Sequence, residues 1–251
     1  MIQANPKTHA WLFLVICLVA FVGAGWFLVN RLRTAYADQL SISIWLPVRR
    51  PVQVSTALNG TVQRTVLLFG DSRMAQWKPA PPPGVRVINA GMPGATTGEL
   101  RLELPALLDE FKPDCLVIEA GINDLKLLGI RPARSGELVG LVLTNLSALA
   151  DEGLDHHCQV LLLTTWPTAS PELARRMVWS EAVPHAIDEL NRQLSSIMAS
   201  RKEVRVVDLL SRAGITPDEH TFLNALHLRP ATYERLTPLL WAAIENQSDA
   251  K

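Results

Sequence analysis

The sequence carries no excess of charge of either sign. Its 251 residues include 24 Lys or Arg and 24 Asp or Glu, so the formal net charge is zero. A nucleic-acid-binding domain usually shows a basic excess, because the phosphate backbone is negative, and this balance argues against nucleic acid as a partner. A chain of this length is sufficient for one domain with a well-buried core.

Cysteine is scarce as well, and the three residues present do not suggest a disulfide framework. Cys115 and Cys158 lie at the edges of expected strands, where a free thiol packs as a small hydrophobe. His156-His157-Cys158 contains metal-binding residue types, but adjacent residues of an extended segment point to opposite faces. We interpret this segment as a helix end entering a strand, and we expect no metal site.

One long segment, Ala10 to Val29, contains no charged residue. Its twenty residues would rise about 30 Å as a helix, enough to cross the hydrocarbon core of a bilayer. Trp11 and Trp26 lie near its two ends, as aromatic residues at a membrane interface do. We therefore expect a single-pass membrane anchor.

A cleaved signal peptide is the alternative interpretation of this segment. Ala35-Tyr36-Ala37 resembles a cleavage site, but the apolar stretch is long for a signal peptide, and Arg31 and Arg33 lie between it and the site. Basic residues lie on both sides of the segment, so the positive-inside rule favours neither orientation. We expect a short cytoplasmic tail with the globular domain outside, because a single N-terminal anchor is a common export device.

The chain is thus expected to have four parts. These are a cytoplasmic tail and anchor (1–33), a juxtamembrane linker (34–63), a globular domain (64–246) and a short tail (247–251). The linker shows no clear hydrophobic period, and we expect at most a short strand near Ile42-Ser43-Ile44.

Short apolar runs alternate with helical patterns in the domain. Strands are expected at Thr65–Phe69, Val85–Asn89, Cys115–Glu119, Val160–Thr164 and Val204–Val207. Helices are expected at Thr97–Phe111, Leu138–Glu152, Trp179–Arg201 and Thr232–Glu245. The strands are apolar at consecutive positions, which is typical of strands buried on both faces. The alternation predicts a parallel sheet with helices on both faces, whose ligand site lies beyond the carboxyl ends of the strands.

Four loops place chemically useful residues at that edge. Ser72 follows the first strand, Gly91 the second and Asn123 the third, and His227 comes just before the last helix. A hydroxyl, an imidazole, an amide donor and closely approaching backbone N–H groups are what acyl transfer requires. Ser attacks, His takes and returns the proton, and the donors stabilise the oxyanion.

These pieces resemble the SGNH hydrolase family, also called GDSL-like lipases and esterases. Gly70-Asp71-Ser72 matches the first block of the family, Gly91 the second, Gly121-x-Asn123-Asp124 the third and His227 the last. The resemblance covers roughly Thr65 to Leu240. It implies a three-layer α/β/α sandwich with a five-stranded parallel sheet, and no metal or organic cofactor.

The resemblance also implies a role for each matched residue. Ser72 would be the nucleophile and His227 the general base and acid. The oxyanion hole would consist of the Ser72 and Gly91 backbone N–H groups and the Asn123 side chain.

The sequence departs from the family at Asn224, where the acid of the triad normally stands three residues before the His. An amide oxygen can accept the imidazole N–H but offers no negative charge, and a flipped amide would favour the wrong tautomer. In a serine protease the comparable change lowers kcat about 10⁴-fold. Three interpretations are open: a Ser–His dyad oriented by Asn224 or a backbone carbonyl, a substitute acid such as Asp218 or Glu219, or loss of activity. We favour the dyad.

Other residues near the expected site have structural interpretations. We expect Asp71 to act as a turn or helix cap. Arg73 and Arg229 are expected to be solvated surface residues, with binding of an acidic substrate as the alternative. Trp77 and Trp166 follow strands and would form either a substrate-binding wall or part of the core.

The functional hypothesis is a membrane-anchored carboxylic-ester hydrolase that forms an acyl-Ser72 intermediate. Its substrate would be a small acyl ester, such as an O-acetyl group on a polysaccharide. The alternatives are an O-acetyltransferase with the same site, a catalytically weak or silent carbohydrate-binding or assembly subunit, and a lipase. The sequence does not determine the oligomeric state.

Overall fold

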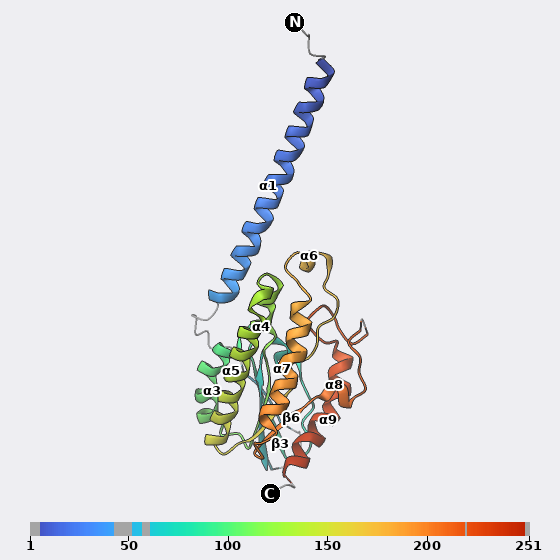
Figure 1. Ribbon diagram of the computed structural model, residues 1–251. Helices are drawn as coiled ribbons and strands as arrows, with labels where there is room; N and C mark the ends of the chain where they lie inside the picture. Colours follow the sequence, from blue (N-terminus) through green and yellow to red (C-terminus); the bar gives the residue numbers. More distant parts are fainter. Residues whose placement is uncertain (1–5, 43–51, 57–60, 219, 249–251) are drawn as a thin grey trace. The chain divides into compact units, whose positions relative to one another are not determined.

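The computed structural model describes residues 6–42, 52–56, 61–218 and 220–248 (Figure 1). These residues belong to two compact units, one within Met1–Ile42 and one within Ser43–Lys251. The first unit is a helix and the second is an α/β domain that carries all of the expected site residues.

The first unit is the single helix α1, Pro6–Ile42. Its stretch Ala10–Tyr36 has the length and composition of a membrane span, and an N-terminal signal sequence would meet the same criteria. The helix continues beyond the expected anchor because no Pro or Gly lies between Val29 and Ile42. A strand near Ile42-Ser43-Ile44 was expected, but Ile42 ends the helix, and the other two residues lie outside the described part of the chain.

The domain contains a six-stranded sheet with the order β1-β3-β2-β4-β5-β6. The strands are β1 Gln53–Thr56, β2 Arg64–Gly70, β3 Val85–Gly91, β4 Cys115–Glu119, β5 Gln159–Leu163 and β6 Val204–Val207. The five expected parallel strands are confirmed. The prediction of a purely parallel five-stranded sheet is wrong, because β1 pairs antiparallel with β3 at the edge. All four residues of β1 are exposed and only Val54 is a large apolar residue, so β1 has no apolar run to reveal it.

Helices cover both faces of this sheet (Figure 1). On one face α3, α5 and α7 pack side by side, and on the other lie α2, α8 and α9. Their bounds are α2 Ser72–Gln76, α3 Thr97–Phe111, α5 Ser135–Asp155, α7 Ala182–Met198, α8 Leu209–Arg212 and α9 Pro230–Ser248. Shorter elements are α4 Ile122–Leu125, η2 Lys126–Gly129, η3 Pro132–Arg134 and α6 Leu173–Arg176. The expected three-layer α/β/α sandwich is therefore confirmed.

The central strand β2 shows how the sequence specifies this burial. Residues 65–70 are all buried, and Val66 and Leu68 face the core beneath α2, α8 and α9. The side chains of Leu67 and Phe69, at the alternate positions, are fully buried on the opposite face. Consecutive apolar residues are needed because the sheet is covered on both sides.

The register of the strands brings the expected site loops to one edge. Gly70 at the end of β2 pairs with Gly91 at the end of β3 and with Glu119 at the end of β4. The residues that follow these three strands therefore leave the sheet at the same level, which is where parallel α/β sheets form ligand sites.

Candidate active site

Ser72 is the first residue of α2, directly after the turn that ends β2. A Cβ atom on Gly70 would lie 1.9 Å from the Glu119 carbonyl oxygen, so glycine alone permits this turn. Asp71 is the N-cap of α2, as expected, and its carboxylate accepts a hydrogen bond from the Arg73 N–H at 2.9 Å. The Ser72 N–H has no acceptor within the helix, because it belongs to the first turn.

His227 faces Ser72. Its Nε2 atom lies 3.0 Å from Ser72 Oγ, which is hydrogen-bonding distance. The two residues are 155 positions apart in the chain, and the fold brings them together across the carboxyl edge of the sheet. This contact is the geometry that a Ser–His pair needs for proton transfer.

Asn224 contacts the imidazole of His227 on the side away from Ser72. Its Oδ1 atom lies 3.1 Å from His227 Nδ1. The same oxygen accepts the backbone N–H groups of Leu226 at 2.9 Å and His227 at 3.0 Å. A flipped amide would turn its NH₂ group toward these two donors, so the oxygen faces the imidazole. Nδ1 therefore carries the proton, and Nε2 presents its lone pair to Ser72.

Of the two carboxylates considered as substitute acids, Asp218 lies in the described part of the chain and serves another role. Asp218 Oδ1 accepts the N–H groups of His220 at 3.0 Å and Thr221 at 2.8 Å, which closes its own turn. Glu219 lies outside the described residues. The side chain that contacts His227 Nδ1 is Asn224.

The environment of His227 lowers its pKa. Burial is the largest cause, followed by the positive charges of Arg73, Arg175 and Lys126, while Glu172 acts in the opposite direction. Burial disfavours the charged imidazolium, and the cations repel it. His227 is therefore held in the neutral form that accepts a proton.

Two of the three expected oxyanion donors, the Asn123 amide and the Gly91 N–H, donate hydrogen bonds within the protein. The Asn123 amide, which is buried, donates one hydrogen bond to the Ala95 carbonyl at 2.8 Å and has a second N–H. The Gly91 N–H donates to Asn89 Oδ1 at 2.9 Å. A Cβ on Gly91 would lie 2.2 Å from the Ala75 nitrogen, so glycine allows α2 to pack against the end of β3.

The expectation that Arg73 is a solvated surface residue is wrong. Arg73 is fully buried, not solvated, and its guanidinium binds the carbonyls of Leu226 at 2.8 Å and Trp166 at 2.7 Å. It also forms a 3.4 Å ion pair with Glu119, which is equally buried. Since Leu226 precedes His227, Arg73 fixes the loop that carries His227. Glu119 was the sequence feature that could have indicated this burial, because a carboxylate at the end of a buried strand needs a positively charged or hydrogen-bonding partner.

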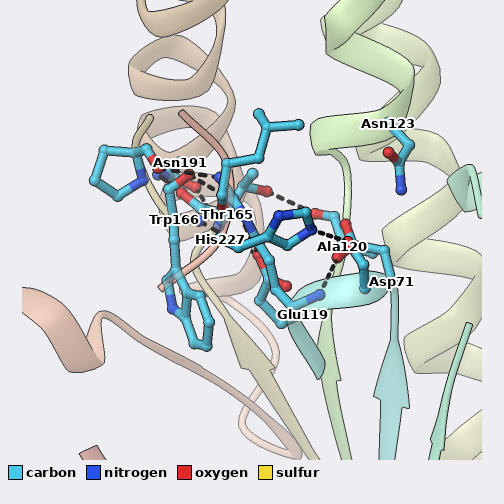
Figure 2. Close-up of polar contacts among 12 residues, drawn as sticks. Asp71, Glu119, Ala120, Asn123, Thr165, Trp166, Asn191 and His227 are labelled. Atoms are coloured by element: carbon cyan, nitrogen blue, oxygen red, sulfur yellow. Dashed lines mark hydrogen bonds and ion pairs between the residues drawn. The ribbon is translucent and has the colours of Figure 1, made fainter. Parts of the chain in front are cut away.

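Figure 2 shows the buried polar groups around Glu119 and His227. Glu119 has a pKa raised to about 8, first through burial and then through the neighbouring charge of Asp71, although Arg73 opposes both. Nearby, Thr165 donates to the Ala120 carbonyl at 2.6 Å, and Asn191 binds the Thr165 backbone. These bonds tie the ends of β4 and β5 to α7.

Trp77 and Trp166 belong to the core. Both are fully buried, and they pack with Tyr233 at ring-centroid distances of 5.8 to 5.9 Å.

His156 caps α5 ahead of β5, as expected for a helix end entering a strand. In the described part of the chain, no cluster of three His, Cys, Asp or Glu could hold a metal ion. Arg229 is exposed, as expected.

The chain belongs to the GDSL-like lipase/acylhydrolase family, whose model matches residues 67–235. The expected membership of this family is therefore confirmed.

Solved structures with the same fold include three bacterial enzymes. A lipase/acylhydrolase from Enterococcus faecalis is 25% identical, with a TM-score of 0.55 over 74% of this chain and 97% of its own. A GDSL-like lipase from Bacteroides thetaiotaomicron is 17% identical, with a TM-score of 0.57 over 85% and 97%. An acetylxylan esterase from Geobacillus stearothermophilus is 18% identical, with a TM-score of 0.56 over 73% and 94%. No curated protein matched the chain.

Proposed function

We propose that this protein is a membrane-anchored carboxylic-ester hydrolase that acts through an acyl-Ser72 intermediate. The observation that carries the proposal is the hydrogen-bonded series Ser72, His227 and Asn224, with distances of 3.0 and 3.1 Å. Membership of the acylhydrolase family supports ester hydrolysis as the reaction class.

In the proposed reaction, His227 Nε2 removes the proton from Ser72 Oγ as this oxygen attacks the ester carbonyl carbon. The imidazolium then gives this proton to the alcohol oxygen, which leaves, and the acyl group remains on Ser72. A water molecule enters, loses a proton to Nε2 and attacks the acyl carbon. The bond between this carbon and Ser72 Oγ then breaks, the imidazolium returns its proton to Oγ, and the carboxylic acid is released.

The oxyanion is stabilised by the Ser72 N–H and by the second N–H of the Asn123 amide. The Gly91 N–H joins them if Asn89 Oδ1 releases it when the substrate binds. Preorganised donors of this kind typically contribute 10²- to 10³-fold each to kcat.

For the substrate we propose an O-acetyl ester of a polysaccharide. The similarity to an acetylxylan esterase supports a small acyl group on a sugar. A membrane span at Ala10–Tyr36, with the domain on the outer side, would place the site near envelope or secreted polysaccharides. A phosphatase reporter fused to the C-terminus tests this orientation, since it is active only outside the cytoplasm.

The experiment for the activity is a panel of p-nitrophenyl esters of rising chain length, beside acetate release from an acetylated polysaccharide. We expect the acetate ester to be cleaved fastest and Ser72→Ala to abolish cleavage. Faster cleavage of long-chain esters would instead indicate a lipase, and acetyl transfer to an added sugar would indicate a transferase.

A further inference from the structure

The loop between β5 and α7 is hydrogen-bonded to the loop that carries His227. The first of these loops starts at the carboxyl edge of the sheet and contains the short helix α6 (Figure 1). Its Ala169 N–H donates to the Ala225 carbonyl at 3.0 Å, and the Ala225 N–H donates to Glu172 Oε1 at 3.0 Å. Both polar backbone groups of Ala225 are thus bonded to the β5–α7 loop.

The hydrogen bond between Glu172 and Ala225 bears on the position of the imidazole. Because Ala225 is fully buried, its N–H needs an acceptor within the protein, and the half-exposed carboxylate of Glu172 supplies it. Ala225 directly follows Asn224, whose side-chain oxygen lies 3.1 Å from His227 Nδ1. The bond therefore fixes the backbone beside the residue that orients the imidazole.

Glu172 also carries a negative charge. The hydrogen bond from Ala225 is the largest cause that lowers its pKa, and the ion pair with Arg175, at 3.1 Å, acts in the same direction. The carboxylate is therefore ionised at neutral pH.

Charged side chains from three elements act on the imidazole of His227. Burial lowers its pKa most, and positive charges lower it further; these belong to Arg73 of α2, Arg175 of α6 and Lys126 of η2. Glu172, at the start of α6, acts in the opposite direction and raises the pKa. Its carboxylate thus offsets part of the repulsion between these cations and the imidazolium.

This effect is one that Asn224 cannot give. In the proposed reaction the imidazolium of His227 forms while Ser72 attacks the ester, and in a triad with a carboxylate the acid stabilises that positive charge. The amide of Asn224 is neutral and orients the ring only. Glu172 brings a carboxylate to the same loop at the adjacent residue, Ala225.

We propose that Glu172 is a positioning residue of the Ser72–His227 site: it anchors the loop through Ala225 and supplies, from a distance, part of the negative charge that Asn224 lacks. The inference rests on the proposed esterase function and concerns the same site. Solvent screens a half-exposed carboxylate, so the effect of the charge is smaller than that of a buried triad acid.

Glu172→Gln in the full-length protein separates the charge from the hydrogen bond, because the amide oxygen can still accept the Ala225 N–H. We expect kcat for p-nitrophenyl acetate to fall about two- to fivefold with KM unchanged, since the charge acts on the imidazolium and not on the bound ester. The pKa of His227, obtained from the pH profile of kcat/KM, should fall as well, because the positive charge of Arg175 is left unpaired.

Glu172→Ala removes the charge and the acceptor together. We expect kcat to fall at least about tenfold, because the buried Ala225 N–H loses its partner, and the Gln variant should recover most of this loss. Glu189→Gln is the matched control. It breaks an exposed pair of the same i,i+3 spacing with Arg192 on α7 and should leave kcat and the pKa of His227 unchanged.

An NMR titration of the imidazole measures the pKa of His227 without catalysis. Full-length Ser72→Ala/Glu172→Gln should show a lower pKa than Ser72→Ala. An unshifted pKa together with a wild-type kcat in Glu172→Gln overturns the role of the charge, and a Glu172→Ala variant no slower than Glu172→Gln overturns the anchoring of the loop. Failure of wild-type protein to cleave any ester overturns the esterase function, while the titration still tests the effect of Glu172 on His227.

Discussion

The side-chain oxygen of Asn224 lies 3.1 Å from His227 Nδ1 and also accepts the His227 backbone N–H at 3.0 Å. One residue thus sets both the position of the loop and the tautomer of the base. In triads with a carboxylate, the acid orients the imidazole and also stabilises its positive charge. Asn224 supplies the first of these effects and lacks the second.

Replacement of Asn224 by Asp should therefore accelerate ester cleavage. A carboxylate keeps the three hydrogen bonds and adds a negative charge beside the imidazolium. We expect kcat/KM for p-nitrophenyl acetate to rise about 10- to 100-fold at pH 8, less than the 10⁴-fold of the serine-protease example because the tautomer is already correct. Asn224→Ala should lower it, since the orienting acceptor is lost. A folded Asp variant no faster than wild type would contradict this account.

The pH dependence of kcat/KM should follow the lowered pKa of His227. An imidazole acts as a base only when it is neutral, so a lowered pKa extends activity toward acidic pH. On the acidic side of the pH profile, which we call the acidic limb, kcat/KM should therefore fall to half its maximum below the ordinary histidine pKa of about 6.5. Arg175→Met removes one of the repelling cations, so it should raise the pKa and move the acidic limb to higher pH. Arg176→Met, in the same short helix, is the control. An unmoved limb in the Arg175 variant would exclude this electrostatic effect.

Arg73 should be a major contributor to stability, because it is buried and holds the His227 loop. Arg73→Met leaves the enclosed carbonyls of Leu226 and Trp166 without their donor, and each buried polar group left unsatisfied costs about 1–3 kcal/mol of unfolding free energy. The exposed Arg212→Met should cost about 0.5 kcal/mol or less. Urea unfolding followed by tryptophan fluorescence measures both values. Similar small losses in the two variants would show that Arg73 is not the clamp inferred from its contacts.

Glu119 should make stability fall as the pH rises. Its pKa is raised to about 8 in the folded protein, against 4.5 as the ordinary value. Between these values the folded state holds a proton that the unfolded state has lost, so unfolding free energy decreases with pH, by at most about 1.4 kcal/mol per pH unit. Glu119→Gln removes this dependence, and unfolding curves from pH 5 to 8 compare the two slopes. Parallel slopes would mean that Glu119 ionises normally.

Much of the fold could be predicted from the sequence, because the sheet is buried on both faces and its strands appear as uninterrupted apolar runs. β1 could not, since an exposed edge strand gains its stability from pairing with β3, which leaves no local pattern. The placement of Ser72, Gly91 and Asn123 at the ends of successive strands could be predicted for a similar reason, because parallel strands end at one edge.

The orientation of the Asn224 amide could not be predicted from the sequence, and the burial of Arg73 was indicated only indirectly, by the carboxylate of Glu119. Both depend on contacts between segments distant in the sequence or on backbone N–H groups whose direction the sequence does not reveal. An arginine after a candidate nucleophile is more often solvated, and only the fold shows that the Leu226 and Trp166 carbonyls enclose this one.

The central claim is that Ser72 is a nucleophile activated by His227, and labelling with a fluorophosphonate tests it most directly. These reagents form a covalent bond with an activated serine. We predict a single label on Ser72 by mass spectrometry, absent in Ser72→Ala and formed at least about 100-fold more slowly in His227→Ala. Folded wild-type protein that takes no label at Ser72, or that is labelled equally fast without His227, would contradict the account.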